Sequence, residues 1–141
     1  MNDELKIKMY SFTVDCTDPQ ELASFYAALL KWEVLVFDED WVCVHAPGTN
    51  QGTYPGILFQ KNPEYKPPVW PDKPGTQQQM AHFDFAVNDL DQAVHHAIQC
   101  GAKIADEQFS EIWTVMLDPA GHPFCLCQMK SMMESPHFGL L

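Results

Sequence analysis

The sequence predicts an α+β fold built from two copies of a strand–helix–three-strand (βαβββ) module. Apolar and polar side chains alternate along residues 7–16 and 80–87, as is typical of strands with one buried face. A helix-start signal follows each stretch, and three further short strand patterns follow each predicted helix. Ser11 and His82 head matching strands 71 positions apart, so the order of elements is repeated.

The first module is predicted to span residues 7–60. Asp18 as N-cap, Pro19 at the first helical position and Glu21 three residues after the cap form a capping box, so a helix is expected to run from there to about Lys31. Three short strands follow at residues 32–37, 41–45 and 57–60.

A proline-rich connector is predicted at residues 61–78, where five prolines interrupt any apolar periodicity. The second module is expected at residues 79–128, with Asp89 as N-cap and Gly101 as C-cap of its helix. Its later strands are expected at residues 103–105, 112–117 and 123–128. Residues 1–130 would form one domain with a curved sheet, followed by a loose tail at residues 131–141. The expected core residues are Phe12, Val14, Leu22, Phe25, Leu29, Phe83, Phe85, Val94 and Ile98.

Composition excludes several classes of function. The net charge is −11 and only 8 of 141 residues are Lys or Arg, which argues against binding to nucleic acid or to a membrane surface. No apolar run approaches the length that crosses a bilayer, and residues 1–10 lack a signal-peptide pattern, so a cytoplasmic location is expected. The five cysteines lack framework spacing and are expected to be reduced thiols.

The strand at residues 80–87 places polar groups on one face and Phe83 and Phe85 on the other. His82 and Asp84 are therefore candidates for a general base and the group that orients it. The alternative for His82 is a structural role, as a partly buried histidine that is hydrogen-bonded to Asp84 or to a backbone group. Cys125 shares a strand face with Cys127, which favours packing over nucleophilic chemistry because no nearby cation would lower a thiol pKa.

Several short motifs carry a family resemblance. They are Asp15-Cys16-Thr17-Asp18-Pro19, Phe59-Gln60, a Pro-Trp-Pro connector, His82-Phe83-Asp84 and Asp118-Pro119-Ala120-Gly121-His122-Pro123-Phe124. With the doubled module, they make residues 7–128 resemble the vicinal oxygen chelate (VOC) superfamily, which includes glyoxalase I, bleomycin-resistance proteins and extradiol dioxygenases. The small glyoxalase-like domains are the most similar group. The resemblance implies a cavity lined by both modules and a homodimer.

Metal-dependent members of that superfamily use four ligand positions, which the resemblance assigns here to Ser11, Gln60, His82 and Cys125. Only His82 keeps the usual ligand type, since Ser and Gln are poor ligands for Fe(II), Ni(II) or Zn(II). The expectation is therefore no metal and no cofactor. A weak site made by His82 and Cys125 with water or substrate is the alternative. The residues expected to contact a ligand are Ser11, Asp15, Trp41, Gln60, His82, Asp84, Trp113 and Cys125.

Three functions remain open at this point. The first is a metal-free protein that binds a small organic molecule, which the missing ligands favour. The second is a lyase, isomerase or dioxygenase-type enzyme that uses His82 as a base or as a ligand of a reduced metal site, which the His-x-Asp pair favours. The third is an interaction module, which rests on the Pro-Trp-Pro connector and the acidic composition. For Trp41 and Trp113, packing in the core is the alternative to contacting a ligand.

Overall fold

A computed structural model describes residues 4–49 and 55–129 of the chain. It contains two compact units, Met1–Tyr65 and Lys66–Leu141, each of which is described below by itself. The division falls inside the predicted proline-rich connector. The predicted tail at residues 131–141 lies outside the described residues.

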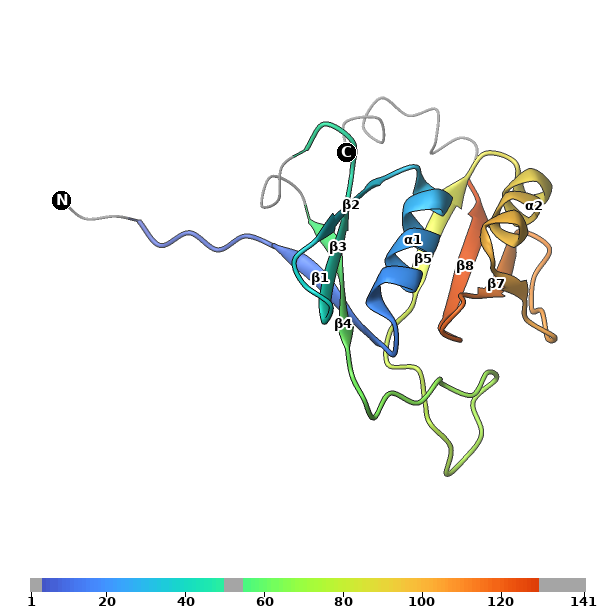
Figure 1. Ribbon diagram of the computed structural model, residues 1–141. Coiled ribbons are helices and arrows are strands. Elements are labelled where there is room, and N and C mark those ends of the chain that lie inside the picture. The colour runs from blue at the N-terminus through green and yellow to red at the C-terminus, as the bar shows by residue number, and fades with distance from the viewer. Residues whose placement is uncertain (1–3, 50–54, 130–141) are drawn as a thin grey trace. The chain divides into compact units, whose positions relative to one another are not determined.

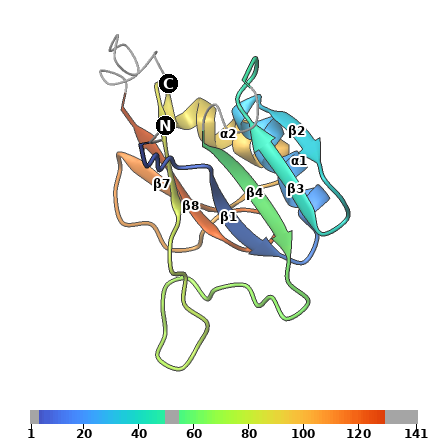
Figure 2. The ribbon, with the colours of Figure 1, turned by 90° about the vertical axis from the view of Figure 1, so that its left-hand side faces the viewer.

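The first unit folds as a four-stranded mixed sheet with one helix. Its strands lie in the order β1-β4-β3-β2, with β1 parallel to β4 and the other neighbours antiparallel. Figure 2 shows β4 and β3 between β1 and β2, which form the two edges. The elements are β1 (Ser11–Cys16), α1 (Pro19–Leu30), β2 (Glu33–Val36), β3 (Trp41–His45) and β4 (Gly56–Lys61).

The second unit repeats this topology after the connector. Its strands lie in the order β5-β8-β7-β6, again with one parallel pair, β5 and β8 (Figure 1). The predicted α+β fold with two βαβββ modules is confirmed, and each module has its own mixed sheet. The elements are β5 (Phe83–Val87), α2 (Leu90–Cys100), β6 (Lys103–Ile104), β7 (Trp113–Leu117) and β8 (Pro123–Gln128).

Both helices begin where the sequence predicts. The Asp18 carboxylate accepts a hydrogen bond from the Glu21 backbone N–H, and Asp89 accepts one from the Gln92 N–H, each at 3.1 Å. These bonds satisfy N–H groups that have no partner within the helix. Gly101 ends α2 at a φ of 122°, as expected of a C-cap glycine. Among the described residues, neither helix is long or apolar enough to span a membrane.

One face of each sheet packs under the helix of its own module. In the first sheet, the Phe59 ring stacks on Tyr26 of α1 with a centroid distance of 5.5 Å. In the second sheet, the Gln128 side chain accepts a hydrogen bond from the backbone N–H of Leu90, at the start of α2. Because side chains alternate along a strand, Phe124 and Leu126 of β8 share the face of Gln128. The opposite face of each sheet is turned away from its helix.

Two of the predicted core residues are not buried. Phe12 is 43% exposed because α1 packs over β2, β3 and β4 and leaves the edge strand β1 less covered. Ile98 is 44% exposed, while its neighbour Ala97 is fully buried, so Ile98 lies at the margin of the buried stripe of α2. Leu22 and Phe25 are buried as predicted, and the other members of the predicted core are partly buried.

Candidate functional site

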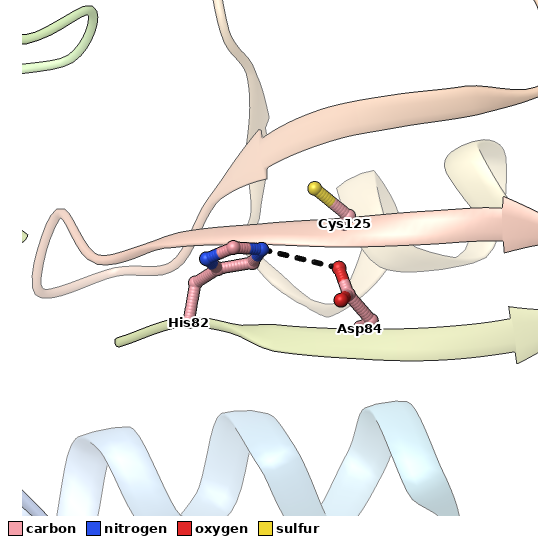
Figure 3. A group of neighbouring side chains, drawn as sticks. All are labelled: His82, Asp84 and Cys125. Atoms are coloured by element: carbon pink, nitrogen blue, oxygen red, sulfur yellow. Dashed lines mark ion pairs between the residues drawn. The ribbon is translucent and has the colours of Figure 1, made fainter. Parts of the chain in front are cut away.

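The face of the second sheet that is turned away from α2 carries a cluster of polar side chains. Asp84 of β5 is paired in register with Cys125 of β8, so their side chains lie on the same face, opposite Phe124. The alternation predicts a strand that begins near residue 80 and contains His82. In the structure, β5 begins at Phe83, and His82 lies one residue before it. It is two residues from Asp84 and on the same side. Figure 3 shows His82 and Asp84 on one segment and Cys125 on the neighbouring strand.

The three side chains approach one another closely. The His82 Nε2 atom lies 3.2 Å from the Asp84 Oδ1 atom. One potential ligand atom from each of His82, Asp84 and Cys125 lies within 4.8 Å of the others. The side chains of His82 and Asp84 are 38% and 63% exposed, so solvent reaches this pair. A histidine beside an accessible carboxylate can donate or accept a proton at a bound molecule.

The Cys125 thiol is held in its protonated form. Its pKa is raised from the ordinary value of 9.0 to about 11, first because burial disfavours the thiolate. The negative charges of Asp84 and Cys127 add to the effect, and so does the hydrogen bond that the thiol donates to Asp84. Burial and the Asp84 charge also raise the pKa of Cys127. Near neutral pH, Cys125 is therefore a weak hydrogen-bond donor and not a nucleophile.

Trp113 adds an aromatic surface to the same face. It lies on β7, in register with Cys127 of β8, and is 37% exposed. Directly opposed residues of antiparallel strands point to one side, so Trp113 shares the face of Cys125 and Cys127. The structure therefore brings His82, Asp84, Trp113 and Cys125, four of the predicted site residues, to a single face of the second sheet.

The first sheet carries the other four predicted residues on the face turned away from α1. Asp15 is in register with Gln60 across β1 and β4, and Trp41 of β3 is in register with Gln60. The Gln60 Nε2 donates a hydrogen bond to Asp15. The other carboxylate oxygen accepts one from Asn62 Nδ2 at 3.1 Å. Asn62 is absent from the predicted set, although its place two residues after Gln60 puts it on the same side.

Ser11 lies apart from this carboxylate–amide group. It is in register with Gly56, four residues before the pairing of Asp15 with Gln60. Four residues of a strand span roughly 13 Å. Ser11 and Gln60 are thus at opposite ends of the β1–β4 pairing, and within the first module they do not form one ligand pair.

The strand registers also correct the assignment of Gln60. In the second module, Cys125 is in register with Asp84, whose counterpart in the first module is Thr13. Thr13 is in register with Leu58, so Leu58 corresponds to Cys125. Gln60 corresponds to Cys127. Matching by spacing from Gly56 and Gly121 misplaces this position by two residues, because Gly56 is in register with Ser11 and therefore corresponds to Pro123.

These positions do not fit a four-ligand metal centre. The first-module positions that correspond to His82 and Cys125 are Ser11 and Leu58, and neither side chain is a good metal ligand. The second module alone offers three donor groups, two of them open to solvent.

A second histidine–carboxylate pair closes the turn between β7 and β8 and was not predicted from the sequence. Asp118 is 5% exposed and accepts hydrogen bonds from the backbone N–H groups of Ala120 and His122. The His122 Nδ1 lies 2.8 Å from the Asp118 carboxylate. These bonds stabilise the turn, so this pair is structural.

Comparison with known proteins agrees with the fold and with the repeated module. Residues 11–127 match the family model described as glyoxalase-like domain, so the chain belongs to that family. The fold places it in the VOC superfamily. A comparison with curated proteins finds no match.

Solved structures with the same fold include proteins of different activity. One is a glyoxalase/bleomycin resistance protein/dioxygenase family enzyme from Burkholderia phytofirmans, with 14% identity, coverage of 85% of this chain and 97% of that chain, and a TM-score of 0.61. The trypanothione-dependent glyoxalase I of Leishmania major has 18% identity, 96% coverage of both chains and a TM-score of 0.60. TnmS3, an antibiotic binding protein from Streptomyces sp., has 14% identity, coverage of 89% and 98%, and a TM-score of 0.55. At these identities the similarity shows the fold alone.

Proposed function

We propose that the chain binds a small organic molecule and that the helix-free face of the second module supplies the main polar contacts. The observation that carries this proposal is the group of His82, Asp84 and Cys125 within 4.8 Å on that face. A solved protein of the same fold, TnmS3, is described as antibiotic binding. Binding without the superfamily's four-ligand metal agrees with the residues present in the first module.

The chemistry of the cluster suggests the kind of ligand. Asp84 is a hydrogen-bond acceptor, the Cys125 thiol is a weak donor, and a neutral His82 offers one donor and one acceptor. Trp113 provides a partly exposed indole on the same face. A ligand with a planar aromatic part and both donor and acceptor groups would match these side chains. Ser11, Asp15, Trp41 and Gln60 remain predicted contacts of the first module.

Tryptophan fluorescence titration tests the proposal directly. The probes are bleomycin and a panel of heteroaromatic carboxylic acids and amides, each added to the full-length chain. A binding probe is expected to change the emission, because a ligand stacked on Trp113 alters the surroundings of its indole. Isothermal titration calorimetry then gives the dissociation constant of each probe that changes the emission.

Variants on the two sides of the second sheet separate binding from folding. His82→Ala and Asp84→Ala are expected to weaken binding at least about tenfold, which is about 1.4 kcal/mol. Both should leave the unfolding temperature nearly unchanged, since these side chains are exposed. His95→Ala and Asp91→Ala remove exposed groups of the same types from α2 and should leave binding unchanged. Equal losses in the two sets, or binding that survives His82→Ala and Asp84→Ala, would refute the proposal.

An enzymatic role is the second candidate, and the distance of 3.2 Å between His82 and Asp84 favours it. Asp84 would hold the imidazole in one orientation while His82 removes a proton from the bound molecule. The test is turnover of any identified ligand, followed by NMR, in wild type and in His82→Gln. Turnover abolished by His82→Gln with binding retained would move the enzyme hypothesis to first place.

A further inference from the structure

Three sulfur-containing side chains, called the sulfur row below, follow one another along one side of β8. Cys125 and Cys127 lie on the helix-free face, and both are half-buried free cysteines. Met129 comes directly after the strand and is 39% exposed. Its backbone N–H donates a hydrogen bond of 2.9 Å to the Val87 carbonyl, which continues the pairing of β8 with β5. Alternation therefore places the Met129 thioether on the side of the two thiols.

The first module shows that the fold does not require sulfur at these positions. The residues that correspond to the sulfur row are Leu58, Gln60 and Asn62. The Gln60 and Asn62 side chains both donate hydrogen bonds to Asp15, so they lie on one side of the strand, as the alternation predicts for the row. Since the same module folds with none of these sulfur atoms, packing alone does not account for the row.

The central position of β8 fixes the spacing of the two thiols. β8 lies between β5 and β7, and both neighbours hold Cys125 and Cys127 in register (Figure 1). Residues two positions apart on a strand have Cα atoms roughly 6.6 Å apart. That separation is near the upper limit for a disulfide, and the two side chains point in parallel directions. An ion between the sulfur atoms needs less approach, because two metal–thiolate bonds of about 2.3 Å span roughly 4.6 Å.

We propose that the sulfur row binds one Cu(I) ion through the thiolates of Cys125 and Cys127 and the thioether of Met129. Soft thiolate and thioether donors select Cu(I), whereas Zn(II) sites use thiolate, imidazole or carboxylate ligands. The ion displaces the two thiol protons, which pass to solvent, and its oxidation state does not change. Trp113 is in register with Cys127 and is 37% exposed, so its indole lies beside the site.

The negative charge of Asp84 acts against the ion. Burial and this charge raise the pKa of both thiols. Two thiolates around a monovalent cation carry a net negative charge, which a neighbouring carboxylate disfavours. Asp84→Asn should therefore strengthen the binding of Cu(I). A metal centre made by His82, Asp84 and Cys125 would instead be weakened, because it would lose a carboxylate ligand, so weaker binding in Asp84→Asn would overturn the proposal.

Anaerobic titration of the full-length chain with Cu(I), in competition with the chelator bicinchoninate, measures the affinity. The wild type is expected to retain one Cu(I) per chain. Cys125→Ser and Cys127→Ser should each raise the dissociation constant at least about tenfold, and Met129→Leu should raise it about threefold. Cys100→Ser is the matched control and should leave binding unchanged. It removes a half-buried thiol of α2 whose Sγ lies 3.8 Å from the His96 Nε2. Circular dichroism verifies that each variant is folded.

X-ray absorption at the copper edge locates the ion in the wild type without any substitution. Only sulfur neighbours are expected, and the emission of Trp113, measured as the difference between wild type and Trp113→Phe, should change on binding. His82→Ala should retain Cu(I) although it is expected to lose the organic ligand, so the two sites fail separately. A nitrogen neighbour that is lost in His82→Ala, unchanged affinity in Cys127→Ser, or loss of the ion in Cys100→Ser would overturn the proposal.

Discussion

The two modules share one topology and one pattern of strand registers, yet their helix-free faces differ in chemistry. At one matched pair of positions, the first module has Thr13 and Leu58 where the second has Asp84 and Cys125. Two residues further along, Asp15 and Gln60 stand where the second module has Ala86 and Cys127. Each parallel strand pair, β1–β4 and β5–β8, therefore carries one carboxylate on this face, displaced by two residues relative to the other.

The surroundings of the two carboxylates differ more than their positions do. Asp15 accepts hydrogen bonds from two side-chain amides, Gln60 and Asn62, and is partly buried. Asp84 has a histidine and a thiol as neighbours, and its side chain is 63% exposed. A carboxylate whose oxygens already have amide donors has less remaining capacity for a ligand, so the comparison favours Asp84 over Asp15 as the carboxylate of the proposed binding face.

In contrast, both modules have a tryptophan at the same position of the helix-free face. Trp41 is in register with Gln60 and Trp113 with Cys127, so the two indoles occupy equivalent positions. They are 40% and 37% exposed. Packing in a core would bury them, and the observed exposure leaves each indole open to an aromatic contact.

The largest expected effect lies under α1, where the helix-covered faces of the modules differ. Tyr26 is fully buried and stacks on Phe59, whereas the equivalent residue of α2 is Ala97. Tyr26→Ala should lower the free energy of unfolding by about 3–5 kcal/mol, because it removes a large buried ring. Urea denaturation followed by circular dichroism measures the change, with the exposed Ser24→Ala as control. A loss no larger than that of the control would show that the first module does not depend on this ring.

A smaller effect should separate the two carboxylates. Asp15→Ala leaves the amides of Gln60 and Asn62 without their acceptor and should cost about 1–3 kcal/mol of stability. Asp84→Ala should change stability by less than about 0.5 kcal/mol, because exposed positions tolerate substitution. Equal costs in urea denaturation would contradict the division into a structural and a functional carboxylate.

Sequence reasoning was most successful where local chemistry determines the structure. The two capping aspartates, the C-cap Gly101 and the turn from Asp118 to Gly121 are set by side chains within a few residues, and the structure contains each of them. The alternation along β5 also predicts correctly which residues share the face of Asp84. Local patterns of this kind need no knowledge of distant contacts.

The failures arise from contacts that are distant in sequence. Alternation assigns Phe12 to the covered face, but only the packing of α1 decides how far along the sheet that cover extends. The correspondence of Leu58 with Cys125 needs the pairing of two strands, because no turn motif marks it in the sequence. The hydrogen bond that the Asn62 side-chain amide donates to Asp15 joins residues 47 positions apart. Pairings of this kind follow from tertiary structure and not from local pattern.

The Cys125 thiol offers a test through pH. Its pKa of about 11 means that alkylation by iodoacetamide should be slow at neutral pH and should accelerate as the pH approaches 11. Asp84→Asn removes a negative charge and should shift the profile to lower pH, whereas Asp91→Asn should not. Between pH 9.0 and about 11, the folded state keeps this proton while the unfolded chain loses it. The contribution of the thiol to stability is therefore complete below the unfolded pKa of 9.0 and is lost as the pH rises through about 11. Peptide mass spectrometry measures alkylation at Cys125, and full reactivity at neutral pH would contradict this environment.

The smallest expected signal is that of bound metal. Ser11 and Leu58 contribute no suitable donor, and His82 and Asp84 are open to competing water. The purified chain should therefore contain well below one Fe, Ni or Zn per chain by elemental analysis, and it should not act on the methylglyoxal–glutathione adduct. The Cys43→Ala variant, altered in the first module, provides the background value for a thiol outside the cluster. Stoichiometric metal that is lost in His82→Ala and retained in Cys43→Ala would reverse the assignment, because the second module alone would then hold a metal site.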